Sequence, residues 1–352
     1  MDLQMLEFRA SVMQKIREFF IKKEFLELDT PALSRDLIPE TCLEVFKTEY
    51  ITPWTEEKIP LYLVPSPEIY IKKIISQHKK DVFQLSKCYR NVESVGNIHS
   101  PEFTMLEYYK MGASYLDTAR LTEELFDFLL PPGPTEKGDL ATAPDAGRAG
   151  SATSDKTQTR DQFSYMRPPF VRLTIDDAFR KYAGFALSDC PKSTDLARHA
   201  RELGLEAGTD SPFEDWAWDD LYELILVSCV EPNLPKDRPV MLMDYPAKVP
   251  CLAQEFFRDG MYWKERFELY CAGIELCNCY SEETDKNKIR EYFEKEGELK
   301  KRLARIPHNI DKDYWKVFEG FPKCSGNAIG VDRLIALLSG HKTIESVLPF
   351  LV

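Results

Sequence analysis

Two groups of polar residues interrupt segments of the chain that otherwise have the composition of β-strands. The first lies between residues 90 and 109 and consists of Arg90, His99, Glu102, Phe103, Glu107 and Tyr109. The second has spacings of seven, three and four residues and consists of Glu268, Glu275, Asn278 and Glu282. Because strands normally bury apolar side chains, polar residues in such segments are candidates for a functional site.

Glu268 and Glu275 are separated by an odd number of residues, which places them on opposite faces of a regular strand. A bend or β-bulge near Gly273 would bring both toward one pocket. Several carboxylates at one site need compensating cations, which indicates a divalent metal ion, an ammonium-bearing substrate or both. The alternative is a solvated sheet face with ordinary ion pairs, and spacing alone favours that alternative.

The segment from Gly326 to Leu334, GNAIGVDRL, places small residues just before an expected helix start near Asp332. Small residues on a strand let a flat ligand approach closely, and Arg333 would stack on an aromatic base or pair with a phosphate. A packing turn between a strand and a helix is the commoner meaning of this pattern. Cys271, Cys277 and Cys279 also lie close together, but without C-x-x-C spacing or paired histidines they favour core thiols over a zinc site.

Composition restricts the class of protein. The 352 residues are 43% hydrophobic and 12% aromatic, which excludes a disordered chain. The net charge of -12 argues against a nonspecific nucleic-acid-binding protein, although a local basic patch is compatible with it. There is no apolar run of about 18 residues and no uncharged N-terminal stretch, so we expect neither a membrane span nor a signal peptide. Together with nine scattered cysteines, an odd number, this predicts a cytoplasmic protein with reduced thiols.

The helices and strands that must position these residues can be predicted from the pattern of apolar residues. They indicate an α+β fold, with an antiparallel sheet flanked by helices. Residues 3–20 are predicted to form a helix, whose apolar face would contain Leu3, Leu6, Ala10, Met13, Ile16 and Phe20. A strand over residues 25–30 would end at Pro31. Residues 82–89 and 103–109 are predicted to be two antiparallel strands around a polar loop, and residues 266–280 read as another long strand.

Residues 131–162 differ from the rest of the chain in composition. This segment contains one leucine and no isoleucine, valine, methionine or aromatic residue, so it has little apolar surface to offset the entropy of ordering. We therefore expect a single catalytic domain over residues 1–352 that is interrupted by a disordered insertion. An interdomain linker is the alternative interpretation.

Five segments in order resemble the class II aminoacyl-tRNA synthetase catalytic core of the lysyl type. They are SPEIYIKKII, VFQLSKCYRN, HSPEFTMLEYY, RFELYCAGIELCNCYSEETD and GNAIGVDRLIALL. The resemblance covers nearly the whole chain apart from residues 131–162. More narrowly, the sequence is similar to the elongation factor P–lysine ligases, which are lysyl-tRNA synthetase paralogues without an anticodon-binding domain. The predicted first helix begins at residue 3, so we expect no such domain here.

The resemblance implies an amino-acid site composed of Ser66, Pro67, Glu68, Glu107, Tyr109, Asn278, Glu282 and Ala328. Glu68 would bind the amino group of the substrate. Glu107, Tyr109 and Glu282 would enclose its side-chain ammonium. Such a site rejects uncharged analogues, because their binding leaves buried carboxylates unpaired. Ala328 matches the ligases, whereas the synthetases usually have glycine there, and this difference would suit a β-amino acid.

The resemblance also implies an ATP site composed of Arg90, Asn91, Glu93, His99, Ser100, Phe103, Glu275, Leu276, Gly330 and Arg333. Phe103 and Arg333 would enclose the adenine, and His99 would face the outer phosphates. Glu268 and Glu275 would hold magnesium. Arg90, Glu275 and Arg333 are the implied catalytic residues, which would act by positioning and charge neutralisation without a covalent nucleophile.

Three positions depart from the family pattern. Val92 stands where the family has an adenine-reading glutamate, and the neighbouring Glu93 is the expected substitute. Ser100 replaces an asparagine and Cys279 replaces a glycine. None of these changes removes a charged group that adenylate formation requires.

The implied activity is ATP-dependent activation of lysine or β-lysine as an adenylate, followed by transfer to a lysine of elongation factor P. No tRNA and no membrane partner are expected. The resemblance implies a homodimer that pairs through the strand ending at Pro31 and the helix before it. The alternatives are a ligase or truncated lysyl-tRNA synthetase with another acceptor, and a non-catalytic paralogue. Loss of catalysis is disfavoured by four intact residues, Arg90, Glu268, Glu275 and Arg333.

Overall fold

A computed structural model describes residues 2–92, 96–132, 162–206, 208 and 212–350. The predicted insertion at 131–162 lies outside the described residues except at its two ends. Glu93, the expected substitute for the adenine-reading glutamate, also lies outside them. The prediction that these positions are disordered or bind adenine is therefore not addressed by the structure.

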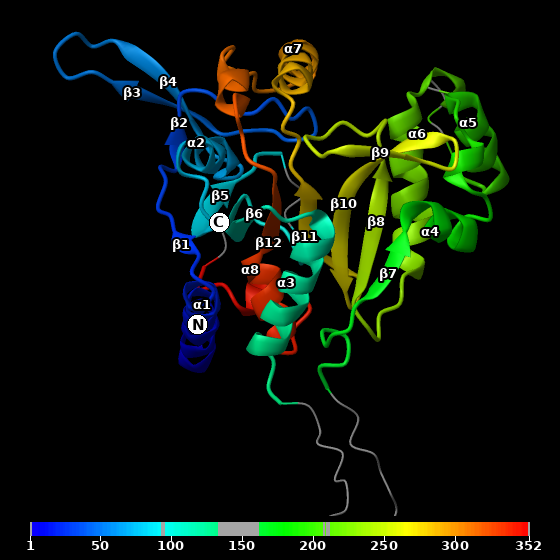
Figure 1. Cartoon of the computed structure of the whole chain (residues 1–352), viewed down its shortest axis with the longest axis horizontal. Helices are drawn as coiled ribbons and strands as arrows, with labels where there is room; N and C mark the ends of the chain where they lie inside the picture. The colour runs from blue at the N-terminus through cyan, green and yellow to red at the C-terminus, as the bar shows by residue number, and fades with distance from the viewer. Residues whose placement is uncertain (1, 93–95, 133–161, 207, 209–211, 351–352) are drawn as a thin grey trace, which may run out of the picture.

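A nine-stranded mixed sheet forms the centre of the molecule (Figure 1). Its strand order is β1-β5-β6-β12-β11-β10-β8-β7, and β9 pairs with β10 outside this path. The strands are β1 (Leu26–Glu27), β5 (Val82–Tyr89), β6 (Glu102–Met111), β12 (Cys324–Gly330), β11 (Ile274–Ser281), β10 (Met261–Cys271), β8 (Val240–Pro246), β7 (Val171–Thr174) and β9 (Glu255–Arg258). The predicted α+β class is confirmed, and the inner strands are antiparallel as expected. Both edges, β1–β5 and β7–β8, are parallel instead.

Helices cover both faces of this sheet. The helices α1 (Leu3–Lys22), α3 (Tyr115–Leu129) and α8 (Val331–Leu338) share one apolar core with the sheet, whereas α2 (Glu68–His78) and α7 (Lys286–Leu303) pack on the other face. The helices α4 (Ile175–Tyr182), α5 (Ser193–Glu202) and α6 (Trp218–Ile225) form a third core beside β7 and β8 (Figure 1). A separate hairpin sheet contains β2 (Leu33–Ser34), β4 (Lys58–Leu63) and β3 (Lys47–Ile51). Among the described residues, no helix has the length and apolarity that crossing a membrane requires.

Two sequence predictions need correction at the N-terminus. The helix forms as predicted, but its buried residues are Val12, Ile16, Phe19 and Phe20, while Leu3 is 67% exposed. The buried residues begin at Val12 in the middle of the helix, and Phe20 near its end stacks on Phe83 of the sheet. The strand predicted over residues 25–30 shortens to Leu26–Glu27, which pairs in parallel with β5.

The run at residues 266–280 is a hairpin of β10 and β11 rather than one strand. Ala272 and Gly273 join the two strands with φ values of 53° and 80°. Positive φ at both central residues is the conformation of a tight hairpin turn whose twist matches that of the strands. An apolar residue before glycine is not a typical turn sequence. The sequence pattern therefore predicts one continuous strand over these residues.

A buried ion pair connects the N-terminal helix α1 to the C-terminal helix α8. Arg9 of α1 lies 2.7 Å from Asp332 of α8 and donates to the Thr104 hydroxyl at 2.9 Å. The second Asp332 oxygen accepts from the Thr104 backbone N–H at 2.7 Å. The side chains of Arg9 and Asp332 are only 12% and 4% exposed. This contact therefore joins α1, β6 and α8 next to Arg333.

Replacing Arg9 by methionine should destabilise the protein, because it leaves the Asp332 carboxylate buried without its cation. We expect a loss of about 3 kcal/mol in the free energy of unfolding, measured by urea denaturation. Arg17→Met is the matched control, since Arg17 pairs with Glu27 at the surface, where the two side chains are 38% and 35% exposed. The control should lose less than about 1 kcal/mol. Equal losses in both variants would contradict the structural role of the Arg9–Asp332 pair.

Candidate active site

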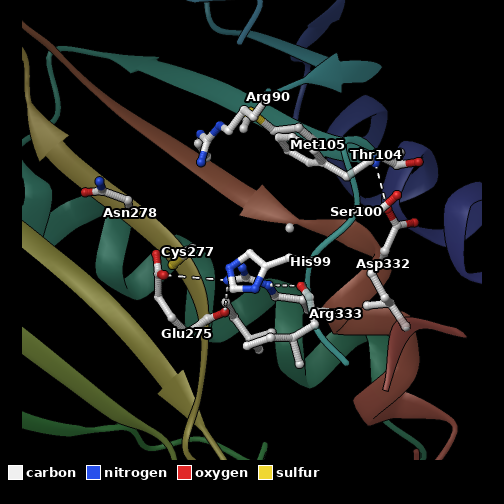
Figure 2. A pocket seen from close by; sticks show the side chains of 16 residues that line it. Arg90, His99, Ser100, Thr104, Met105, Glu275, Cys277, Asn278, Asp332 and Arg333 are labelled. Carbon is white, nitrogen blue, oxygen red and sulfur yellow. Dashed lines mark hydrogen bonds and ion pairs between the residues drawn. The ribbon is translucent and has the colours of Figure 1, made fainter. Parts of the chain in front are cut away.

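A cavity opens where the 96–101 loop and α8 meet the strands β6, β11 and β12 (Figure 2). The predicted site residues that line it are Arg90, His99, Ser100, Phe103, Glu275, Leu276, Asn278, Ala328, Gly330 and Arg333. Residues separated by more than 200 positions are thus brought together by neighbouring strands. The structure places most of the predicted ATP site in one pocket.

Arg333 connects three parts of this cavity. Its side chain donates to the Ile98 carbonyl at 3.0 Å and to the Glu275 carbonyl at 2.8 Å. Its guanidinium also lies 3.5 Å from the Glu275 carboxylate. On the opposite wall, the Arg90 guanidinium lies over the Phe103 ring, 5.2 Å from its centroid. The cavity therefore combines two cations with an aromatic face, which suits a ligand that has both a base and phosphates.

A β-bulge places the two predicted metal-binding carboxylates on one face. Leu269 pairs with Cys277 and Tyr270 pairs with Glu275, so Leu276 is an extra residue in β11. One extra residue reverses the alternation of side chains. Glu275 consequently faces the same side as Glu268 and Asn278, which are directly opposite each other. The predicted bulge is confirmed, and it lies at Leu276 while Gly273 forms the turn.

Glu268 and Glu275 nevertheless have different surroundings. The Glu268 carboxylate accepts from Arg266 at 2.6 Å on one oxygen, and from the hydroxyls of Tyr245 and Tyr270 at 2.7 and 2.9 Å on the other. Its side chain is 12% exposed, whereas that of Glu275 is 42% exposed and lines the cavity. No group of three or more potential metal ligands occurs among the described residues. Glu275 therefore fits magnesium better than Glu268, which would have to release Arg266.

A second set of residues forms a buried polar site on the same face of the sheet as the cavity, farther along β6 and β12. Glu107 of β6 accepts a hydrogen bond from Ser66 at 2.7 Å and another from Tyr109 at 2.6 Å. The Ser66 hydroxyl also accepts from the Glu68 backbone N–H at 3.1 Å, which helps to begin α2. Glu107 and Tyr109 share a face because they are two residues apart on a strand. Thus Ser66, Glu68, Glu107 and Tyr109 are brought together as predicted.

Lys72 is the residue of this site that the sequence reasoning missed. It lies one turn after Glu68 on α2, its side chain is fully buried, and it contacts the Glu68 carboxylate. Its ammonium group also lies 2.6 Å from Glu282. A lysine four residues after a glutamate usually indicates an ion pair on a solvated helix face. The available signal was that this pair sits in an otherwise apolar helix segment, beside Ile69, Ile71 and Ile75, which are also buried.

Gly326 leaves room for this group of side chains. It is opposite Tyr109 in the β6–β12 pairing. A Cβ atom at this position would overlap the Tyr109 ring and lie 2.6 Å from a Glu282 oxygen. Glycine is therefore required at this position, because the side chains of Tyr109 and Glu282 approach its backbone closely.

Burial and mutual repulsion perturb the acids of this site. Burial, together with the nearby charge of Glu68, raises the pKa of Glu107 to about 7. Burial also raises the pKa of Glu282, and the Lys72 ammonium opposes that rise. Burial opposes the charge on Lys72, but the carboxylates of Glu282 and Glu68 outweigh it and hold the pKa of Lys72 well above its usual value. Such shifts are typical of functional sites.

Three of the residues considered from the sequence lie outside both pockets or have other partners. The Asn91 side chain donates to the Val45 carbonyl at 3.3 Å and does not line the cavity. Glu102 forms a surface ion pair with Lys87 at 3.1 Å. Cys279 is buried, with its sulfur 3.6 Å from the Ser325 hydroxyl, and all nine cysteines are free.

The chain belongs to the class II aminoacyl-tRNA synthetase family. The family model described as "tRNA synthetases class II (D, K and N)" matches residues 2–351. This finding confirms the resemblance seen in the five sequence segments.

Within that family, the chain is similar to proteins named "Elongation factor P--(R)-beta-lysine ligase". The protein of Avibacterium paragallinarum is 33% identical over 351 residues, which are 99% of this chain and 95% of the relative. That of Histophilus somni (strain 2336) is 32% identical, with the same coverage of 99% and 95%. That of Hamiltonella defensa subsp. Acyrthosiphon pisum (strain 5AT) is 29% identical, over 97% of this chain and 93% of the relative.

Replacing Gly326 by alanine should destabilise the buried carboxylate site, because the new methyl group displaces Tyr109 or Glu282. We expect a loss of about 1–3 kcal/mol in unfolding free energy, measured by urea denaturation. Gly330→Ala is the matched control on the same strand, where a Cβ atom would make ordinary contacts at 3.6 and 3.8 Å. The control should change stability by less than about 1 kcal/mol. If Gly326→Ala is as stable as the control, the close packing around Gly326 is wrong.

Proposed function

We propose that this chain is an ATP-dependent ligase that activates lysine or β-lysine as an aminoacyl-adenylate and transfers it to a lysine of elongation factor P. The observation that carries the proposal is the buried group of Glu68, Glu107 and Glu282 next to a cavity lined by Arg90, Phe103 and Arg333. The two sites share a strand, since Ala328 lines the cavity and pairs with Glu107 across β6 and β12. A diamino acid would therefore present its carboxyl group to the cavity while carboxylates hold its ammonium groups.

Recognition of the amino acid would depend on charge. Glu68 would accept the amino group near the substrate carboxyl, and Glu107 and Glu282 would accept the distal ammonium, with Tyr109 orienting Glu107. A monoamino acid of equal length would leave a buried carboxylate uncompensated, which is strongly unfavourable. The names of the relatives support β-lysine as a substrate, and Ala328, where the synthetases usually have glycine, would alter the pocket volume next to the substrate.

Adenylate formation would depend on the walls of the cavity. Phe103 and Arg333 would hold the adenine, and Arg90 would lie between the substrate carboxylate and the α-phosphate, lowering the repulsion during in-line attack. Glu275, with Glu268 only after rearrangement of Arg266, would hold Mg²⁺, which neutralises phosphate charge when bound. The acceptor amine would then attack the carbonyl group of the adenylate and release AMP.

The function is tested by amino-acid-dependent exchange of labelled pyrophosphate into ATP with a panel of amino acids. Lysine or β-lysine should support exchange, and monoamino acids should not. A second assay should detect addition of the amino acid to elongation factor P by intact mass, with tRNA as the competing acceptor. Transfer to tRNA alone would favour a truncated synthetase, and absence of exchange with every amino acid would favour a non-catalytic paralogue.

Glu282→Gln should impair amino-acid binding selectively, because the pocket loses one of the carboxylates that compensate the substrate ammonium groups. We expect lysine-dependent exchange to fall roughly 100-fold, while the KM for ATP changes little. The control is Glu298→Gln, which removes a carboxylate whose side chain is 74% exposed on α7. Unchanged lysine-dependent exchange in Glu282→Gln would show that the pocket assignment is wrong.

The chain is further proposed to be a cytoplasmic homodimer. Ile21, Leu26 and Leu33 are 57%, 49% and 40% exposed around the β1 edge of the sheet. An open edge with exposed apolar residues is unfavourable in a monomer, and a symmetric partner would cover it. Light scattering at micromolar concentration should give about twice the chain mass of 40.7 kDa. A monomer mass in a preparation with full exchange activity would contradict the dimer.

A further inference from the structure

Lys72 needs an explanation because a buried ammonium group is costly. Its side chain is completely buried, and its ammonium group lies between Glu68 and Glu282. If the pocket existed only to receive a cationic substrate, an internal cation would compete with that substrate for the same carboxylates. The internal cation must therefore contribute something that the substrate does not.

The contacts of Lys72 divide the oxygens of the two carboxylates. Its ammonium group contacts Oε1 of Glu68 and Oε2 of Glu282. The other Glu282 oxygen, Oε1, lies next to Gly326, 2.6 Å from the position that a Cβ atom there would take. Among the described residues, no hydrogen bond reaches that oxygen or Oε2 of Glu68. Lys72 thus fixes one oxygen of each carboxylate and leaves the second for a ligand.

The charges of the site give a simple balance. When all three are ionised, Glu68, Glu107 and Glu282 contribute three negative charges, and Lys72 contributes one positive charge, which leaves two. A diamino acid brings two ammonium groups, and its carboxylate would face Arg90. Glu40 is a further buried acid near Glu68, and the positive charges of Arg90, Lys72 and Lys300 oppose the rise in its pKa that burial and Glu68 cause. The Lys300 ammonium group contacts the backbone carbonyls of Glu40 and Leu43.

We propose that Lys72 is the resident counter-ion of the amino-acid pocket. It bridges Glu68 and Glu282, and when the three buried carboxylates are ionised it reduces their charge to the two net negative charges that a diamino substrate neutralises. The inference rests on the proposed function and adds a positioning and specificity-determining residue to it. Lys72 does not contact the reacting atoms in this account, so its effect should appear in substrate binding and not in the use of ATP.

The groups that would influence a titration of this pocket come from several elements. They are Glu68 and Lys72 of α2, Glu107 and Tyr109 of β6, Tyr280 and Glu282 at the end of β11, Tyr314, and the more distant Glu40, Arg90 and Lys300. Lys72 is the cation that directly contacts two of these carboxylates. Removing it should therefore raise the pH at which the carboxylates lose their protons.

The test is the pH dependence of the KM for lysine between pH 5.5 and 8.5, from lysine-dependent pyrophosphate exchange. Protonated carboxylates cannot pair with ammonium groups, so the KM should fall as pH rises. In Lys72→Met, this fall should move upward by about one pH unit or more, so that a large defect at pH 7 recovers at pH 8.5. Lys73→Met is the matched control, since Lys73 is the next residue on α2, is 40% exposed and pairs with Asp311 at 3.6 Å.

A double variant separates charge balance from simple structural support. Lys72→Met combined with Glu282→Gln again leaves two net negative charges and should return the pH dependence toward that of the wild type. Circular dichroism melting curves show whether each variant is folded. If Lys72→Met alone does not fold, the pH dependence of the KM for lysine in the double variant tests the inference. An increase in the KM of Lys72→Met that is equal at every pH would overturn the inference. A double variant that is unfolded, or that keeps the shifted pH dependence of the KM, would also overturn it. If the wild-type chain activates no diamino acid, the proposed function fails as well.

Discussion

The structure depends on the compensation of three carboxylates that are buried in one place. Glu68, Glu107 and Glu282 come from a helix, a strand and the end of another strand, and no solvent shell can reduce their repulsion. Hydrogen bonds from Ser66 and Tyr109 stabilise one of them, and the Lys72 ammonium links the other two. Such a group is unfavourable while its members are ionised and uncompensated, which supports the proposed cationic substrate.

The sheet supplies what this constraint needs. Strand β12 runs between β6 and β11, and its small residues allow side chains from both neighbours to approach: Gly326 on the carboxylate side and Ala328 and Gly330 at the cavity. The bulge at Leu276 turns Glu275 toward the same face as Asn278. The Arg9–Asp332 pair holds the start of α8, and with it Arg333, against β6. The two pockets are thereby fixed relative to each other by the same few strands.

Much of this arrangement could be predicted from the sequence, and the failures have physical causes. The β5–β6 pair, the first helix and the grouping of Glu68 with Glu107 and Tyr109 were predicted because periodicity and family motifs report them directly. The β10–β11 turn was missed because Ala272 is an atypical turn residue. The saturation of Glu268 by Arg266 and two tyrosines depends on β8 and β10 lying side by side, which spacing does not encode. Lys72 was missed because a lysine on a helix is normally solvated.

The central claim is that the carboxylate pocket recognises a substrate by its two ammonium groups. Isothermal titration of the wild-type chain with lysine, and in parallel with norleucine, tests it most directly, since norleucine keeps the carbon chain and lacks the distal ammonium. The account predicts measurable binding of lysine and a loss of at least roughly 100-fold for norleucine, equivalent to about 3 kcal/mol. Equal affinities for the two amino acids would contradict it.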